Sequence, residues 1–207
     1  MCGRVDIHTP PSELARILET ALAAGVDPDG RPSWNVPPSR GVPVIVEETA
    51  EQEHSPTASE EDDGARPKFA VASEELKKRL DVYRWGLLPH WAKDTRVGYK
   101  MINARAETLT KSAAYRVPFK DRRCLIVVDG FFEWKSDPTQ PKRKIPFYFR
   151  RADGKPITFA GLYETWWDKS RSKEPDLETL LRTCTIVTTE AGPDMVEVHN
   201  RIPVIIE

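Results

Sequence analysis

The chain has 207 residues, of which 39% are hydrophobic, and its formal net charge is −1. That length suits one domain with its own core, and no stretch approaches the roughly 18 apolar residues of a membrane span. Three cysteines without a CxxC pair argue against a disulfide framework and against a zinc site. We therefore expect an intracellular protein with no membrane segment, no metal and no cofactor.

The chain opens with Met1-Cys2-Gly3-Arg4. A small second residue permits removal of the initiator methionine, which would leave Cys2 with a free α-amine beside its thiol. The amine of such a 1,2-aminothiol condenses with an aldehyde to an imine, and the thiol closes the imine to a five-membered thiazolidine. Reference pKa values of roughly 7.7–8 for the amine and about 8.5 for the thiol leave both groups usable near neutral pH. The alternative is an inert thiol near a frayed terminus.

Short-range patterns predict the elements in chain order. Apolar residues at helical spacing predict an amphipathic helix over Pro11–Ala24, and further helices are expected over Thr108–Tyr115 and Pro193–Val198. Runs rich in β-branched and aromatic residues predict strands at Val42–Val46, Asp81–Trp85, Cys124–Asp129, Pro146–Arg150, Ile157–Tyr163 and Cys184–Thr189. The pattern is typical of one α+β domain over 1–207, a mainly antiparallel curved sheet or open β-barrel with peripheral helices.

The segment 47–68 differs from the rest in composition. Between Glu47 and Asp63 lie eight acidic residues and no Lys or Arg. Without aromatic residues or hydrophobic periodicity, 47–68 is interpreted as a disordered acidic insertion within the domain. Of the 32 acidic residues, these eight leave 24 against 31 basic ones, a balance of about +7. That balance suits a polyanionic partner, although a solvated surface also explains it.

Two rigid loops contain groups that could contact nucleic acid. Trp85-Gly86 followed by Pro89 would form a wall on which a base stacks, and Asn35 to Pro38 is a second such loop. The structural alternatives are a core aromatic residue and an ordinary turn.

Polar side chains at three further places are candidates for chemistry. Alternation in Met101–Glu107 points Asn103, Arg105 and Glu107 to one face, where Asn could orient an oxygen and Arg could bind a phosphate. If that face does not line a cleft, it is solvated surface.

Glu133 lies inside an aromatic run and is a candidate proton shuttle, with a water-facing edge-strand glutamate as the alternative. His199 and Arg201 place a titratable ring and a cation just before an apolar strand, although a lone histidine is often structural.

Together these motifs resemble the SOS-response-associated peptidase (SRAP) family, whose members are abasic-site processing proteins. In chain order the set is Met1-Cys2-Gly3-Arg4, Asn35-x-x-Pro38, Arg84-Trp85-Gly86-Leu87-x-Pro89-x-Trp91, Asn103-Ala104-Arg105-x-Glu107-Thr108, Asp129-Gly130-Phe131-x-Glu133-Trp134 and His199-x-Arg201-x-Pro203. The resemblance runs over nearly the whole chain. It implies a mixed β-barrel-like domain with a positively charged channel, and a stable thiazolidine formed with the ring-opened sugar of an abasic site in single-stranded DNA.

The resemblance also implies roles for single residues. The catalytic set would be Cys2, Asn103, Glu133 and His199. Cys2 would be the nucleophile, Asn103 would hold its backbone or a sugar oxygen, and Glu133 would move protons. His199 would assist sugar-ring opening or β-elimination, which gives an AP-lyase-like activity.

DNA-binding residues would be Arg4, Asn35, Pro38, Trp85, Arg105 and Arg201. Arg4 and Arg105 would bind phosphates beside the lesion. Trp85 and Pro38 would stack on neighbouring bases, and Arg201 would contact the DNA backbone.

From the resemblance we expect a monomer that shields abasic sites in single-stranded DNA near replication-fork proteins. It would lie in the nucleus of a eukaryote, or otherwise in the cytoplasm or nucleoid. Family members usually continue beyond the His199 motif, so we expect either that a C-terminal part of the domain is missing or that this domain is unusually short. Two alternatives remain. One is an N-terminal-nucleophile peptidase that cuts only its own Met1, and the other is a non-covalent reader of modified bases using Trp85 and Arg105.

Overall fold

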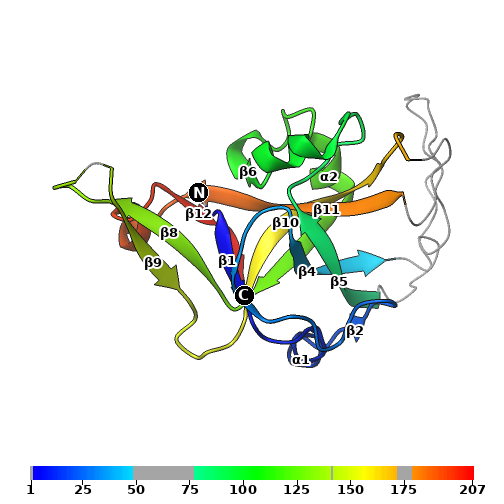
Figure 1. Ribbon diagram of the computed structural model, residues 1–207, viewed down its shortest axis with the longest axis horizontal. Coiled ribbons are helices and arrows are strands. Elements are labelled where there is room, and N and C mark those ends of the chain that lie inside the picture. The colour runs from blue at the N-terminus through cyan, green and yellow to red at the C-terminus, as the bar shows by residue number, and fades with distance from the viewer. Residues whose placement is uncertain (1, 49–76, 141, 172–178) are drawn as a thin grey trace.

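The computed structural model describes residues 2–48, 77–140, 142–171 and 179–207 (Figure 1). The strands are β1 Arg4–Ile7, β2 Ala21–Leu22, β3 Ser33–Val36, β4 Gly41–Glu48, β5 Lys77–Trp85, β6 Asn103–Arg105, β7 Arg123–Val128, β8 Gly130–Ser136, β9 Lys144–Phe149, β10 Ile157–Trp167, β11 Leu180–Glu190, β12 Arg201–Pro203 and β13 Ile205–Ile206. The α-helices are α1 Pro11–Ile17, α2 Arg116–Asp121 and α3 Pro193–Val196, and the 3-10 helices are η2 Thr95–Lys100 and η3 Ala106–Thr108.

Five strands form a closed barrel. Antiparallel neighbours run in the order β11-β10-β7-β4-β5, and a parallel pairing of β11 with β5 closes the ring. Alternate valines of β4, such as Val42 and Val44, point inward and are buried with Trp85 and Phe159. The short strands β6 and β12 pair with β11, so both lie on the barrel rim. The expected mainly antiparallel barrel is confirmed, and it is closed rather than open.

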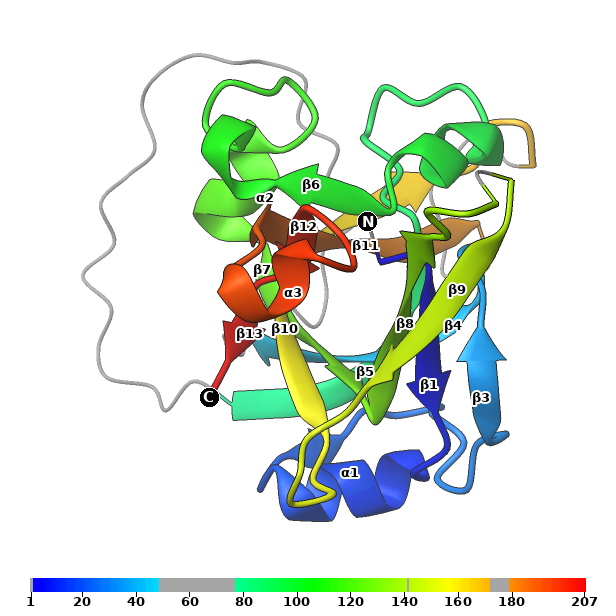
Figure 2. The ribbon, with the colours of Figure 1, turned by 90° about the vertical axis from the view of Figure 1, so that its left-hand side faces the viewer.

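A second, four-stranded sheet in the order β3-β1-β8-β9 lies against the barrel (Figure 2). Its inner face contributes Val5 and Phe131 to the barrel core, where the Phe131 ring meets the edge of Phe159 at 5.5 Å between centroids. The two sheets therefore share one hydrophobic core. The start of the chain is a strand of this sheet rather than a loose end.

The helix predicted over Pro11–Ala24 is wrong in its second half. α1 ends at Ile17, the chain turns at Glu19 with a φ of 49°, and the following residues form β2 beside β5. Leu18 and Leu22 still face the cluster that contains Leu14. The apolar residues that suggested one long helix thus face the same cluster from a short helix and from the strand that follows it.

The helix predicted over Thr108–Tyr115 is also wrong, because η3 ends at Thr108 and α2 begins only at Arg116. Between them the chain folds into turns that bury Leu109. None of the helices in the described part of the chain is long and apolar enough to cross a bilayer.

Other predictions agree more closely with the structure. The helix expected over Pro193–Val198 is confirmed as α3, which ends two residues earlier, and all six predicted strands are present within longer or shifted limits. Of the acidic insertion expected over 47–68, its first two residues belong to β4, and the remainder lies outside the described residues.

A buried carboxylate fixes the register of β1 against β8. Asp129, just before β8, accepts hydrogen bonds from the backbone N–H of His8 (2.7 Å) and of Thr9 (2.9 Å) and from the Thr9 hydroxyl (2.6 Å). Its own N–H donates to the carbonyl of Asp6 at 2.9 Å. Because these bonds join parts of the chain 120 residues apart, they hold two strands that no local turn connects.

We predict that Asp129→Asn destabilises the protein by about 1–3 kcal/mol, because an amide cannot accept all the bonds that both carboxylate oxygens now receive. Urea unfolding measures the loss. Asp137→Asn is the matched control, since Asp137 also accepts three hydrogen bonds but only from residues two or three positions away. Equal losses in the two variants would show that Asp129 is an ordinary turn residue.

Candidate functional site

Cys2 lies at the rim of the barrel, just before β1. Figure 2 shows the start of the chain where β6, β11 and β12 approach the end of β8. The Cys2 side chain is fully buried, and its carbonyl accepts a hydrogen bond of 2.8 Å from Nδ2 of Asn103 on β6. Among the described residues nothing donates to the buried Oδ1 of Asn103. The Asn103 amide therefore holds the N-terminal backbone through its NH2 group, and its oxygen remains available as a hydrogen-bond acceptor.

Glu133 approaches the same place from β8. Arg4 pairs with Phe132 in the antiparallel ladder. The residues that precede Arg4 therefore run alongside the residues that follow Phe132, the first of which is Glu133. The Glu133 side chain faces inward and is 1% exposed. Burial, and next to it the charge of Glu133, raise the pKa of the Cys2 thiol well above its usual value. The thiol is accordingly neutral, with a carboxylate close enough to influence it.

His199 lies on the turn between α3 and β12. Its Nδ1 accepts the backbone N–H of Arg201 at 3.0 Å. β12 and β6 both pair with β11, so this turn and Asn103 share one edge of the barrel. On the surface, Lys135 of β8 reaches Glu197 of the same turn at 3.4 Å. The structure thus brings Cys2, Asn103 and Glu133 together and places His199 on the adjoining turn.

The predicted DNA-binding residues of the small sheet lie side by side. Nη1 of Arg4 donates to Oδ1 of Asn35 at 3.2 Å. Asn35 belongs to β3 rather than to the predicted loop, and Pro38 is half-buried in the turn after that strand. Arg105 is exposed at the end of β6. These positions are compatible with the expected contacts, which stay predictions.

Trp85 cannot stack on a base in this fold, which corrects the prediction made for it. Its side chain is fully buried, and its Nε1 donates to the carbonyl of Ile102 at 2.9 Å. Gly86 follows with a φ of +118°, and a Cβ there would come within 2.6 Å of the Gly98 carbonyl oxygen. The Trp-Gly pair is therefore structural, and the ring that the turn exposes is Trp91, which is 52% exposed.

Arg201 is paired within the protein. It is 7% exposed, and its guanidinium binds both carboxylate oxygens of Glu107 at 2.9 and 3.0 Å. Nη2 also donates to the Thr188 carbonyl at 2.6 Å. Glu107 does not continue the row of Asn103 and Arg105, as had been predicted, because β6 ends before it and η3 turns the chain. Arg201 fixes that turn, and its expected contact with DNA stays a prediction.

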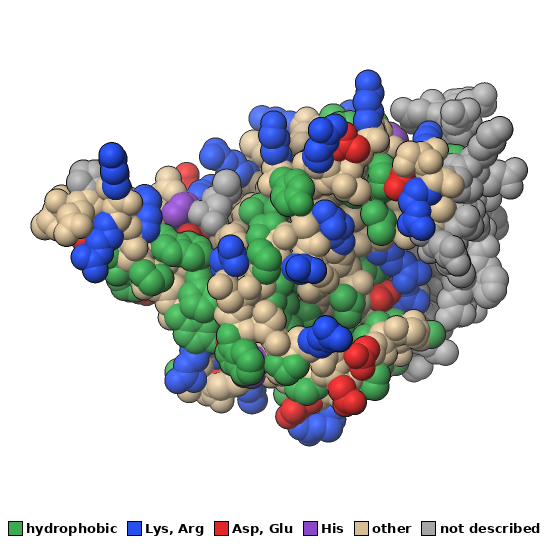
Figure 3. Space-filling model, in the orientation of Figure 1, with side chains coloured by type: hydrophobic (Ala, Val, Ile, Leu, Met, Phe, Trp, Pro, Cys, Tyr) green, Lys and Arg blue, Asp and Glu red, His purple; other side chains and the backbone are tan. Residues whose placement is uncertain are grey.

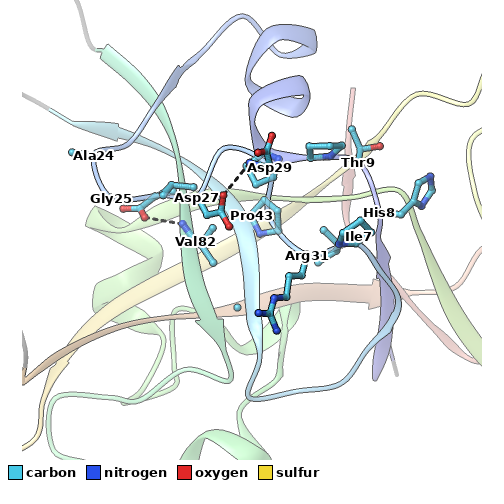
Figure 4. Close-up of a pocket in the computed structure, with 17 residues that line it drawn as sticks. Ile7, His8, Thr9, Ala24, Gly25, Asp27, Asp29, Arg31, Pro43 and Val82 are labelled. Carbon is cyan, nitrogen blue, oxygen red and sulfur yellow. Dashed lines mark hydrogen bonds between the residues drawn. The ribbon is translucent and has the colours of Figure 1, made fainter.

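A hollow of about 520 Å³ lies at the other end of β1 and contains none of the predicted site residues (Figure 4). Arg31 and Asp27 line it, and His8 stands at its rim. Near the rim, Asp6, His8 and Asp129 bring three potential metal-ligand atoms within 4.8 Å of one another. The carboxylate oxygens of Asp6 and Asp129 already accept hydrogen bonds from residues of the small sheet and its loops. These bonds account for the cluster without a metal.

Basic side chains are spread over one face of the molecule. Figure 3 shows Lys and Arg distributed across the whole view, whereas acidic side chains are fewer and gather toward its lower right. This distribution agrees with the positive balance of the chain outside the acidic stretch. It provides a surface to which a polyanion is attracted.

Comparison with known proteins identifies the family. The model of the family "SOS response associated peptidase (SRAP)" matches residues 1–207. The chain is 38% identical to the abasic site processing protein YoqW of Bacillus subtilis over its full length and 76% of that protein. It is 28% identical to the abasic site processing protein HMCES of Xenopus tropicalis, covering 63% of it.

Solved structures share the fold. A crystal structure of a protein from Bacteroides thetaiotaomicron matches the whole chain and 77% of its own length, with a TM-score of 0.71 and 20% identity. A phage-related protein from Bordetella bronchiseptica matches 99% of the chain and 77% of its own length, with a TM-score of 0.60 and 26% identity. On the full-length family match and the 38% identity, the chain belongs to the SRAP family.

Proposed function

We propose that this protein processes abasic sites in single-stranded DNA by linking Cys2 covalently to the lesion after Met1 has been removed. The observation that carries the proposal is the fixed N-terminal backbone, with Asn103 on the Cys2 carbonyl and Glu133 near enough for its charge to raise the pKa of the Cys2 thiol. Relatives named abasic site processing proteins support the same substrate.

The first step joins the α-amine of Cys2 to the aldehyde of the ring-opened sugar. The nitrogen lone pair forms a bond to the aldehyde carbon, and two proton transfers release the carbonyl oxygen as water, which leaves an imine. Glu133 would carry protons in these transfers. Oδ1 of Asn103 has no donor among the described residues, and it would accept the amine N–H and orient its lone pair.

The second step closes the ring. Sγ of Cys2 bonds to the imine carbon, the C=N electron pair returns to nitrogen, and the thiol proton ends on that nitrogen. The raised thiol pKa means that a base must take this proton as the C–S bond forms. Glu133 supplies the base, and the same carboxylate would return a proton if the crosslink reverses.

His199 and the exposed cations complete the proposed site. A ring on the turn beside Asn103 would assist opening of the sugar or β-elimination, the AP-lyase-like activity. Arg4 and Arg105 would bind phosphates on either side of the lesion, and Trp91 takes the stacking role that Trp85 cannot fill.

Removal of Met1 is a precondition, and we propose that the buried Cys2 site can carry it out itself. Mass spectrometry of protein produced without methionine aminopeptidase tests this, and the expected mass lacks Met1. A retained methionine would show that a separate aminopeptidase is required, and the crosslinking proposal would stand.

Cys2→Ser should abolish a heat-stable DNA adduct, because serine would have to form a far less stable oxazolidine. The assay is a denaturing gel after incubation with single-stranded DNA that contains an abasic site. Cys124→Ala, which changes another buried cysteine, should crosslink as the parent does. Undiminished crosslinking by Cys2→Ser would rule out the thiazolidine.

Glu133→Gln should slow crosslinking by about 10²- to 10⁴-fold, the usual contribution of a general acid–base group, with little change in non-covalent affinity. The direction of the change in crosslinking rate distinguishes proton transfer from a purely electrostatic effect. Glu133 raises the pKa of the Cys2 thiol, so removing its charge would increase the thiolate and speed ring closure if electrostatics alone mattered.

Crosslinking rates and affinity for DNA with a non-reactive abasic analogue are measured side by side. Glu164→Gln, at a buried carboxylate paired with Arg122 at 3.0 Å, serves as the control for loss of a buried charge. A faster Glu133→Gln reaction would exclude the proton-transfer role, and an equal loss of affinity would mark Glu133 as structural.

A further inference from the structure

Two aromatic rings stack on the outside of the small sheet, away from the reacting groups. Trp34 of β3 is 62% exposed. Its ring lies nearly parallel to that of His8, with 5.7 Å between centroids and 8° between planes. Since most of Trp34 remains in water, the hydrophobic effect does not account for its position.

An irregularity in the pairing of β3 with β1 places Trp34 on the same side as the DNA-binding candidates. Between two paired positions β3 has one residue more than β1, so Trp34 and Asn35 together stand opposite Asp6. Such bulges redirect side chains. Here Asn35 meets the side chain of Arg4 while its neighbour meets His8. The stacked pair therefore continues the surface that begins at Arg4.

The pair is held in place before any ligand arrives. Nδ1 of His8 lies 2.9 Å from a carboxylate oxygen of Asp6, and the hydroxyl of Tyr148 donates to the other oxygen at 2.6 Å. The backbone N–H of His8 is bound by Asp129. The hydrogen bond to Asp6 raises the pKa of His8 above its ordinary value. A ring fixed in this way loses little conformational freedom on binding.

The local charge selects a base rather than a phosphate. The carboxylates of Asp6 and Asp129 face His8, with side chains 3% and 7% exposed, and they offset the positive charge that the ring carries when it is protonated. A phosphate would therefore gain little here. An open indole face backed by an imidazole is the surface on which a nucleobase stacks.

We propose that Trp34 and His8 form a stacking subsite for one base of the DNA strand that flanks the abasic site. This rests on the proposed function, because the strand reaches the pair by way of Arg4 and Asn35. His8 lies four positions after Arg4, or about 13 Å along an extended strand. A strand stacked as in a duplex advances about 3.4 Å per nucleotide. The base is therefore at most about four nucleotides from the phosphate that Arg4 would bind.

Non-covalent binding to single-stranded DNA with a tetrahydrofuran abasic analogue tests the subsite, because the analogue has no aldehyde and cannot crosslink. With long flanks, Trp34→Ala and Trp34→Leu should each bind about 5- to 100-fold more weakly, the effect of losing one stacked base. Trp34→Phe keeps an aromatic face and should stay near the parent. Ile205→Ala, at a 43% exposed apolar side chain of β13, should change nothing.

Shortening the DNA locates the base. Cutting one flank to a single nucleotide should make the parent and Trp34→Ala bind equally, whereas cutting the other flank should preserve their difference. The subsite is excluded if Trp34→Ala and Trp34→Leu match the parent on long DNA. It is also excluded if their defect persists after either flank has been cut.

Crosslinking separates this subsite from the proposed function. On short DNA with a true abasic site, Trp34→Ala and Trp34→Leu should crosslink at the parental rate, which shows that the fold and Cys2 are intact. If the parent itself forms no adduct, the proposed function fails. If the parent crosslinks and both Trp34 variants bind the DNA as tightly as the parent, the stacking subsite is wrong and the proposed function stands.

Discussion

The site depends on the pairing of β1 with β8. Cys2, the proposed nucleophile, lies near the start of the described chain, and termini are ordinarily the least ordered part of a domain. Here the ladder from Arg4 to Asp6, fixed by the bonds to Asp129, aligns the N-terminal backbone with Glu133. A shift by one residue would turn every side chain to the opposite face and separate the thiol from that carboxylate.

The barrel supplies the other half of the site through β11. This strand pairs with β10, β5, β6 and β12, so segments far apart in the sequence meet along one element. Asn103 and His199 are nearly 100 residues apart in the sequence, yet both adjoin its end. The buried bond network of Arg201 with Glu107 and Thr188 ties the same rim together. Strand pairing thus positions the proposed site, including the turn between α3 and β12 that carries His199.

Much of this site could be predicted from the sequence, because its groups are chemically conspicuous. Cys2 is defined by its position, and a glutamate in an aromatic run or an asparagine in an alternating strand stands out locally. What local pattern could not reveal was which tryptophan faces water, since Trp85 and Trp91 share one motif and only barrel closure buries the first. The same holds for Arg201, whose partner lies 94 residues away. The two wrong helix predictions have a related reason: Leu22 packs against its cluster from a strand and Leu109 is buried from a turn, so neither contact needs a continuous helix.

Burial of the Cys2 thiol is compatible with its proposed chemistry because the order of steps limits what the thiol must do. The amine attacks first, so a neutral thiol does not hinder capture of the aldehyde. Once the imine has formed, the sulfur is tethered to its target, and effective molarities for such ring closures compensate for a small thiolate fraction. A raised pKa also lowers the thiolate fraction, and the thiolate is the form that oxidants attack. In the proposed mechanism, burial therefore lowers the nucleophilicity of the thiol without preventing ring closure.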